Sequence, residues 1–356
     1  MAFAQTTIGV GIILGAYIGG QITHRARPRH AILSGILVCL LSAILGFSAG
    51  NERNELGFGV ALALYGFGQA IAWPAIETAL LEAQKPSRIQ GLVGYFNLTW
   101  SLVSATAFFI ASPLMHFFGL SSLFSVPVII YAVTLLYLLF ALPLTPNPAF
   151  VTEHSASNPN ADVQISPLSE RSRRLFRWLG WLANPLSFIA INVVVVYNPA
   201  IQTRLHLDFA SATIWLSLWF YFRTVGFEIF RRWEGWHYNW ILLCVVYVLT
   251  LFSFSGIVFA PNLASLLISQ AVFGVSLGLI YQSSLFYSMA GSEAQGEHGG
   301  LHECFVGVGL TVGTLIAFLG NRFYPAQPAL PLFAVIAVMM IGLCAMIGIG
   351  LRTRAT

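Results

Sequence analysis

Eleven apolar stretches of the chain are each long enough to cross a bilayer as a helix. A bilayer core needs about 20 apolar residues in a helix, and such stretches lie near 3–22, 30–49, 57–79, 91–117, 121–143, 179–198, 209–230, 238–260, 263–289, 302–320 and 329–350. Only 8% of the residues are charged and 57% are hydrophobic, whereas a soluble domain carries roughly a quarter charged residues. A transmembrane β-barrel needs segments of about ten alternating residues, and these stretches are longer and uniformly apolar. The sequence therefore predicts an all-α, polytopic membrane helix bundle.

Arginine and lysine orient this predicted bundle. If the loops alternate sides from an external N-terminus, thirteen basic residues fall inside and three outside, while Arg223 lies within a span. Because cytoplasmic loops carry an excess of Lys and Arg, we predict a cytoplasmic C-terminus. The expected location is the plasma membrane, which is the inner membrane if the protein is bacterial. Nucleic acid is not an expected partner, because the basic residues lie in short loops and form no continuous patch.

The stretch 145–178 differs from the rest of the chain. It begins Thr-Pro-Asn-Pro, continues through Ser, Asn, Glu and Asp, and ends in four arginines. Such a segment cannot bury enough apolar surface to order itself, so we predict a flexible cytoplasmic linker. The predicted division is a first half over 1–144 with five helices, the linker over 145–178, and a second half over 179–356 with six helices.

A weak internal repeat relates these two halves. At an offset of 206 residues, Gly20 and Arg25 recur as Gly226 and Arg231, Phe67-Gly68 as Phe273-Gly274, and Gly94 as Gly300. Extended backwards, the offset places the counterpart of stretch 179–198 before residue 1. We therefore expect two homologous halves with the first helix of the first half absent. The corresponding hypothesis is that Met1 is an internal or misassigned start.

The loop after the first stretch, residues 20–29, is similar to the loop between helices two and three of the major facilitator superfamily. Gly20, Arg25 and Arg29 match the family pattern, while His24 stands where the family has Asp and Arg27 where it has Gly. Parallel repeats joined by a long cytoplasmic linker occur in the same transporter class. The chain thus resembles this family over its whole length, beginning one helix late.

A second segment carries the same resemblance. Residues 87–94, leading into Asn97 and Trp100, are similar to the start of the family's helix five. The resemblance implies two pseudo-symmetric halves of the major facilitator type with about 11 transmembrane helices. In the family, loops such as 20–29 hold the halves together on the cytoplasmic side through ion pairs.

The resemblance also implies candidate residues for a cytoplasmic gate. Glu77 or Glu82, at the inner end of the third stretch, is the expected partner of Arg25 or Arg29. The alternative is an ordinary interfacial ion pair, which contributes under about 1 kcal/mol. The gate candidates are Gly20, Arg25, Arg29, Glu77, Glu82, Arg231 and Glu303.

Arg223 is the clearest candidate for contact with a solute, because an ionised side chain near the bilayer centre costs roughly 2.5–3.5 kcal/mol. Trp215, Trp219 and Arg223 follow each other at intervals of four residues on one helix face. An indole one turn away can hold the guanidinium by a cation–π contact. The functional interpretation is a group that attracts an anion or orients a substrate. The alternative is snorkelling toward the cytoplasmic interface.

Gln69, Trp73 and Glu77 form a second stripe with the same spacing, on the helix that the resemblance equates with cavity-lining helix four. The alternative role for a single polar residue of this kind is interhelical hydrogen bonding, worth about 0.6 kcal/mol on average. The candidates for a substrate cavity are Gln69, Trp73, Asn192, Trp219, Arg223, Gln270, Tyr281 and Gln282.

Glu303, with His298 and His302 nearby, is a candidate proton-titrating group, because histidine changes charge near neutral pH. The interpretation adopted from the sequence is a solvated helix start, where the helix dipole favours an acidic side chain.

The predicted function is secondary active or facilitative transport of a small solute by alternating access. The alternative is a non-transporting membrane protein of the same fold, such as a sensor or a partner-binding subunit. No enzymatic activity, catalytic residue, metal or cofactor is predicted, since the four cysteines have no CxxC spacing and no nucleotide-binding signature occurs. The expected partners are a small-molecule substrate, the lipid bilayer and, as a further candidate, protons.

Overall fold

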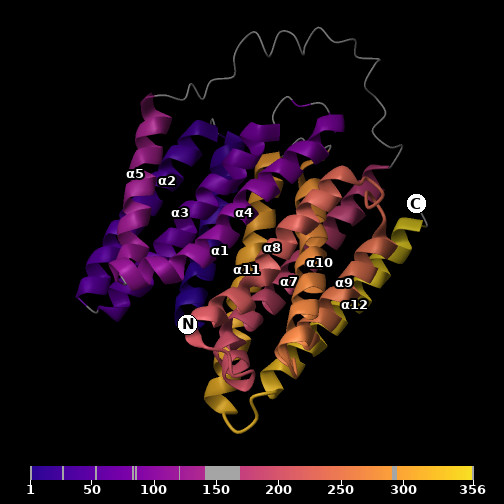
Figure 1. Cartoon of the computed structure of the whole chain (residues 1–356). Helices are drawn as coiled ribbons and strands as arrows, with labels where there is room; N and C mark the ends of the chain where they lie inside the picture. The colour runs from indigo at the N-terminus through magenta and orange to yellow at the C-terminus, as the bar shows by residue number, and fades with distance from the viewer. Residues whose placement is uncertain are drawn as a thin grey trace.

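The computed structural model describes residues 2–25, 28–52, 54–81, 84, 86–119, 121–140, 169–290 and 295–354. Within these residues the chain forms eleven helices (Figure 1), which confirms the predicted all-α bundle. The first five are α1 (Ala2–Arg25), α2 (Pro28–Asn51), α3 (Glu55–Leu81), α4 (Pro86–Phe118) and α5 (Ser122–Phe140). The other six are α7 (Glu170–Arg204), α8 (Phe209–Arg232), α9 (Trp240–Val258), α10 (Leu263–Met289), α11 (Gln295–Phe323) and α12 (Leu330–Arg354).

Ten of the described helices are long and apolar enough to cross a membrane. The exception is α8, which carries Arg223 near its middle and Glu228, Arg231 and Arg232 near its end. Its length of 24 residues still matches the thickness of a bilayer core at about 1.5 Å of rise per residue. The low hydropathy of α8 therefore reflects Arg223, which its neighbours bury, and the charged side chains at its end, of which that of Arg232 is 73% exposed.

The end of α5, the start of α7 and the end of α12 lie at one end of the bundle, and α1 starts toward the other (Figure 1). Most of the predicted linker lies outside the described residues, but its last part is helical. The side chain of Ser169 caps α7 by accepting a hydrogen bond from the backbone N–H of Ser172 at 3.2 Å. Glu170 then pairs with Arg173 at 3.2 Å and with Arg177 at 3.5 Å. These local interactions start α7 nine residues before the predicted apolar span.

The two sets of helices, α1–α5 and α7–α12, meet mainly through two helix pairs, and α3 with α11 and α4 with α10 make further contacts. One pair is α1 with α11, and the other is α4 with α8. The offset of 206 residues relates α1 to α8 and α4 to α11, so each contact is the repeat of the other. Two pseudo-symmetric halves are expected to show such a pair of equivalent contacts.

Small residues allow α1 and α11 to cross closely. A Cβ built on Gly300 would lie 2.8 Å from the Cα of Gly20, which is too close for any side chain. Nearer the start of α1 and the end of α11, the hydroxyl groups of Thr6 and Thr314 are 3.0 Å apart. Backbone contact along this pair therefore depends on glycine, as is common for membrane helices.

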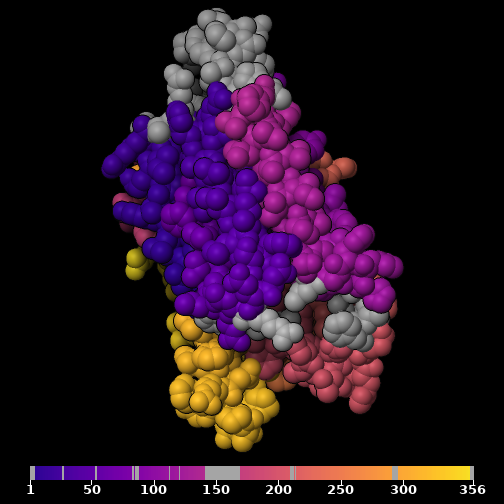
Figure 2. Space-filling model, turned by 90° about the vertical axis from the view of Figure 1, so that its left-hand side faces the viewer, coloured from indigo at the N-terminus to yellow at the C-terminus, as the bar shows by residue number. Residues whose placement is uncertain are grey.

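The main hydrophobic core lies in the second half, around α7. This helix packs against α9, α10, α11 and α12, and 67% of the residues in its most apolar 18-residue stretch are buried. In the first half, the most apolar 18 residues of α1, α2 and α3 are each 39% buried, and those of α5 are only 6% buried. Figure 2 shows this face, with the magenta of α5 along the indigo of α2, the helix that α5 contacts most.

Candidate functional site

A buried cluster of polar and aromatic side chains lies where the two halves meet. It is called here the inter-half cluster. The first half contributes residues from α3 and α4, and the second half contributes residues from α8, α10 and α11. Its buried members are Glu77, Arg223, Tyr281, His302 and Glu303, and Trp100, which is half-buried, belongs to it as well.

Trp100 is the aromatic centre of the cluster. Its ring centroid lies 6.1 Å from that of Trp73, 5.7 Å from that of Phe227 and 5.2 Å from that of Tyr281. These partners lie on α3, α8 and α10, so one indole on α4 touches both halves. Phe188 of α7 extends this group of aromatic rings, with its ring centroid 6.1 Å from that of Tyr281.

Arg223 is buried among aromatic rings. Its side chain is 3% exposed, and its guanidinium carbon lies 4.6 Å from the ring centroid of Trp100, 5.3 Å from that of Trp219 and 5.0 Å from that of Phe220. The predicted contact with Trp219 is therefore confirmed. Snorkelling toward the cytoplasmic membrane surface is not observed, because the guanidinium points to Trp100 on α4 of the other half and is buried there. No described carboxylate forms an ion pair with Arg223, and its Nε has no hydrogen-bond partner.

Tyr281 connects this aromatic region to a carboxylate. Its hydroxyl donates a hydrogen bond of 2.9 Å to Oε1 of Glu303. Nε2 of His302 lies 3.7 Å from the same oxygen, and Nδ1 of His302 lies 2.9 Å from the hydroxyl oxygen of Ser284. Arg223 and Glu303 thus lie on two sides of one tyrosine.

The expectation that Glu303 and His302 lie at a solvated helix start is wrong. Glu303 is 7% exposed and His302 is 0% exposed. The helix α11 begins at Gln295, so both residues lie about two turns inside it, beyond the reach of the dipole at the helix terminus. The glycine-rich segment 296–300 is itself helical and packs against α1 and α3.

Glu77 faces α11 from the first half. Its side chain is 1% exposed, and neither carboxylate oxygen has a hydrogen-bond partner. A Cβ built on Gly299 of α11 would lie 3.0 Å from Oε2 of Glu77, and Glu303 lies one turn after Gly299 on the same helix.

The predicted ion pair of Glu77 with Arg25 or Arg29 is therefore not formed. Arg25 is exposed at the end of α1, whereas the carboxylate of Glu77 lies inside the bundle. The other predicted partner, Glu82, lies outside the described residues.

Several predicted cavity residues have structural partners instead. Gln270 links α10 to α8: its Oε1 accepts from the backbone N–H of Trp219 at 3.1 Å, and its Nε2 donates to the carbonyl of Trp215 at 2.7 Å. Gln69 donates to the hydroxyl of Tyr65 on its own helix at 2.9 Å. Gln270 therefore fits the alternative of interhelical hydrogen bonding, whereas Gln69 is bonded within its own helix.

Asn192 and Gln282 lie outside the inter-half cluster. Asn192 donates to the carbonyl of Phe188, four residues earlier on α7, at 2.8 Å. Gln282 is fully buried, and neither of its side-chain polar atoms has a hydrogen-bond partner. Of the predicted cavity residues, the structure brings together Trp73, Trp219, Arg223 and Tyr281. The sequence interpretation missed Trp100 as a site residue, because its partners lie far away along the chain.

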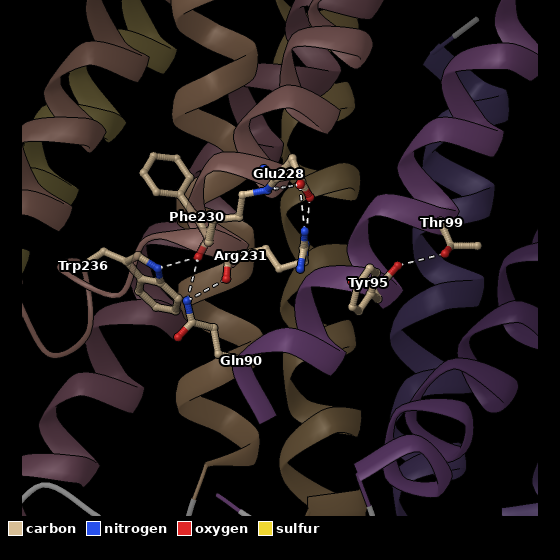
Figure 3. A network of polar contacts seen from close by, with 8 residues as sticks. Gln90, Tyr95, Thr99, Glu228, Phe230, Arg231 and Trp236 are labelled. Atoms are coloured by element: carbon tan, nitrogen blue, oxygen red, sulfur yellow. Dashed lines mark hydrogen bonds and ion pairs between the residues drawn. The ribbon is translucent and has the colours of Figure 1, made fainter. Parts of the chain in front are cut away.

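A second set of contacts, the α4–α8 clamp, joins the start of α4 to the end of α8 (Figure 3). The guanidinium carbon of Arg231 lies 4.3 Å from the ring centroid of Tyr95. Nε2 of Gln90 donates to the carbonyls of Phe230 at 3.2 Å and of Arg231 at 3.0 Å. Glu228 fixes Arg231 by accepting from its Nε at 2.7 Å. The clamp is defined by Gln90, Tyr95, Phe230 and Arg231.

Comparison with known proteins agrees with this architecture. The sequence pattern of the Major Facilitator Superfamily matches residues 1–321. The crystal structure of the human organic anion transporter MFSD10 (TETRAN) superimposes with a TM-score of 0.72 at 13% identity, covering 97% of this chain and 83% of that one. The Escherichia coli fucose:proton symporter FucP superimposes with a TM-score of 0.65 at 14% identity, covering 97% of this chain and 90% of that one. No curated protein matches the sequence.

Proposed function

The chain belongs to the major facilitator superfamily, and on that premise we propose that it is a secondary transporter that moves a small organic anion by alternating access. The anion would bind in the inter-half cluster. Rocking of the first half, 1–144, against the second, 179–356, would expose this cluster to each side in turn. The protein would lie in the plasma membrane, or the inner membrane of a bacterium, with its C-terminus in the cytoplasm. The excess of basic residues on that side supports this orientation.

The observation that supports an anion is the buried charge of Arg223. Removing one ion from water costs several kcal/mol in a real protein. Cation–π contacts return about 2 kcal/mol when they are desolvated. The three rings around Arg223 therefore offset part of this cost, and a bound anion would offset more. The Nε without a partner provides a donor for it.

The position of Arg223 supports binding between the halves. The guanidinium comes from α8, and the closest ring, that of Trp100, comes from α4. A solute held by both would contact the first and the second half together. Transporters with internal repeats bind their solutes at such repeat interfaces. The rings of Trp73, Trp100 and Tyr281 would receive an apolar or aromatic part of the solute.

Binding of benzoate to the full chain in nanodiscs tests this proposal, with benzamide as the neutral analogue. We expect benzoate to raise the melting temperature and benzamide to leave it unchanged. In Arg223→Gln the benzoate affinity should fall by about 2 kcal/mol or more, roughly thirtyfold, because a buried charge pair loses one partner. Arg232→Gln is the matched control, since Arg232 lies on the same helix and is 73% exposed.

Uptake of labelled benzoate into proteoliposomes separates transport from binding. Equal effects of benzoate and benzamide, or full benzoate affinity in Arg223→Gln, would refute the anion site. Binding that depends on Arg223 without any uptake would favour the alternative of a sensor of the same fold.

A further inference from the structure

The two carboxylates of the inter-half cluster lie on helices of different halves. Glu77 belongs to α3 and is 1% exposed, and Glu303 belongs to α11 and is 7% exposed. We propose that Glu77 and Glu303 form a proton-binding site that bridges the two halves, with the proton on Glu77 and the negative charge on Glu303.

A single shared proton follows from the burial of both groups. Two ionised carboxylates in one low-dielectric space repel each other, and the usual outcome is that one of them stays protonated. No described lysine or arginine forms an ion pair with either carboxylate. Glu77 contacts α11 at Gly299, one turn before Glu303, so the repulsion between the two carboxylates is relieved most simply by a proton.

Hydrogen bonding decides which carboxylate holds the proton. Glu303 accepts the hydroxyl of Tyr281 at 2.9 Å, which stabilises a negative charge on Glu303. The two oxygens of Glu77 accept no hydrogen bond, so nothing nearby compensates an anion there. A protonated Glu77 removes that uncompensated charge.

The other charged and titratable groups around the pair favour the same assignment. His302 of α11 lies 3.7 Å from Glu303. Arg223 of α8 packs on the ring of Trp100, which lies 5.2 Å from that of Tyr281, the hydrogen-bond donor to Glu303, so both groups lie on the side of Glu303. One turn earlier on α11, His298 is held by Arg177 of α7 at 2.8 Å. On α1, the nearest charged side chains are those of His24 and Arg25, which are exposed.

This site would make contact between the halves depend on the proton. With Glu77 protonated, α3 packs against α11 at Gly299. When the proton leaves Glu77 for water, two negative charges face each other across the same contact, and their repulsion favours separation of α3 from α11. The inference does not require that the solute be an anion, and it can be tested without a solute.

Infrared difference spectroscopy of the full chain in nanodiscs, titrated with pH, tests the assignment. At neutral pH we expect the carbonyl stretch of a protonated carboxyl group, and we expect it to disappear at high pH. Glu77→Gln should lose this band. Glu303→Gln should keep it at a shifted frequency, because Glu77 remains and loses its charged neighbour. Glu297→Gln, an exposed carboxylate on the same helix as Glu303, should leave the band unchanged.

Three results would overturn the proposal. They are the absence of the band at neutral pH in the unaltered chain, its survival in Glu77→Gln, and its loss in Glu297→Gln. The Glu303→Gln variant keeps the test decisive if Glu77→Gln does not fold, because an unshifted band in Glu303→Gln would show that the two carboxylates do not interact.

Discussion

Replacing Gly94 by alanine should force α4 away from α8 at the clamp. A Cβ at Gly94 would lie 2.6 Å from the Cβ of Arg231, about 1 Å inside the ~3.5 Å at which carbon atoms attract. The Cβ of Arg231 moves only with the backbone of α8, so a new rotamer cannot relieve this overlap. Gly91, one turn earlier on α4, has open space around its Cβ position and provides a matched control.

The expected magnitude follows from two opposing terms. Overpacking costs about 1–3 kcal/mol, while alanine in place of glycine in a helix gains about 0.5–1 kcal/mol. Gly94→Ala should therefore destabilise the clamped arrangement by about 1–2 kcal/mol, and Gly91→Ala should stabilise the helix slightly. A change of 1–2 kcal/mol alters the ratio of clamped to open molecules by about five- to thirtyfold.

The assay is maleimide labelling of a cysteine at Ile89, a buried residue next to Gln90 of the clamp. The native cysteines are replaced by serine in this background. Gly94→Ala should raise the labelling rate by about five- to thirtyfold, whereas Gly91→Ala should leave it unchanged. Equal rates in the two variants would show that the α4–α8 contact does not control access at this end.

Two further changes test the packing and the pH response. Gly300→Ala should lower the melting temperature by several degrees, because its Cβ would meet the Cα of Gly20 at 2.8 Å, whereas Gly348→Ala should be neutral or stabilising, because that position is open. Burial lowers the pKa of His237, in the loop after α8, below its ordinary 6.5, so the unfolded chain binds this proton more tightly. The contribution of neutral His237 to folding stability should therefore be complete above pH 6.5 and decrease as the pH falls below it. In His237→Phe, the melting temperature should fall less steeply with decreasing pH. If the melting temperature of His237→Phe depends on pH as steeply as that of the unaltered chain, this role of His237 is refuted. An unchanged melting temperature in Gly300→Ala would refute the close crossing of α1 and α11.

The lengths of the apolar stretches predicted the helices well, because the thickness of the bilayer fixes the length of a membrane-spanning helix. The stretch 238–260 became α9 from Trp240 to Val258, and the stretch 209–230 became α8 from Phe209 to Arg232. The start of α7 could not be found in this way. Its first turns are polar and are held by Ser169 and Glu170, and hydropathy does not register a helix that extends beyond the apolar span.

The site was predicted only where its contacts are local. The contact of Trp219 with Arg223 follows from a spacing of four residues. The contact of Trp100 with Arg223 joins residues of different halves, and no spacing in the sequence indicates it. Glu77 was assigned to the wrong partner because depth along α3 can be predicted from the sequence, whereas the direction in which the side chain points depends on how α3 packs against α11.

The repeat indicates that the two carboxylates of the inter-half cluster are not needed for packing. At the offset of 206 residues, the counterpart of Glu303 is Asn97 and that of Glu77 is Ser283. Asn97 and Ser283 are buried as deeply as the carboxylates they replace, so each position tolerates an uncharged side chain in the same type of helix contact. A charge retained at only one of two equivalent buried positions costs free energy that the fold itself does not require. That cost is lowered if Glu77 and Glu303 share a proton.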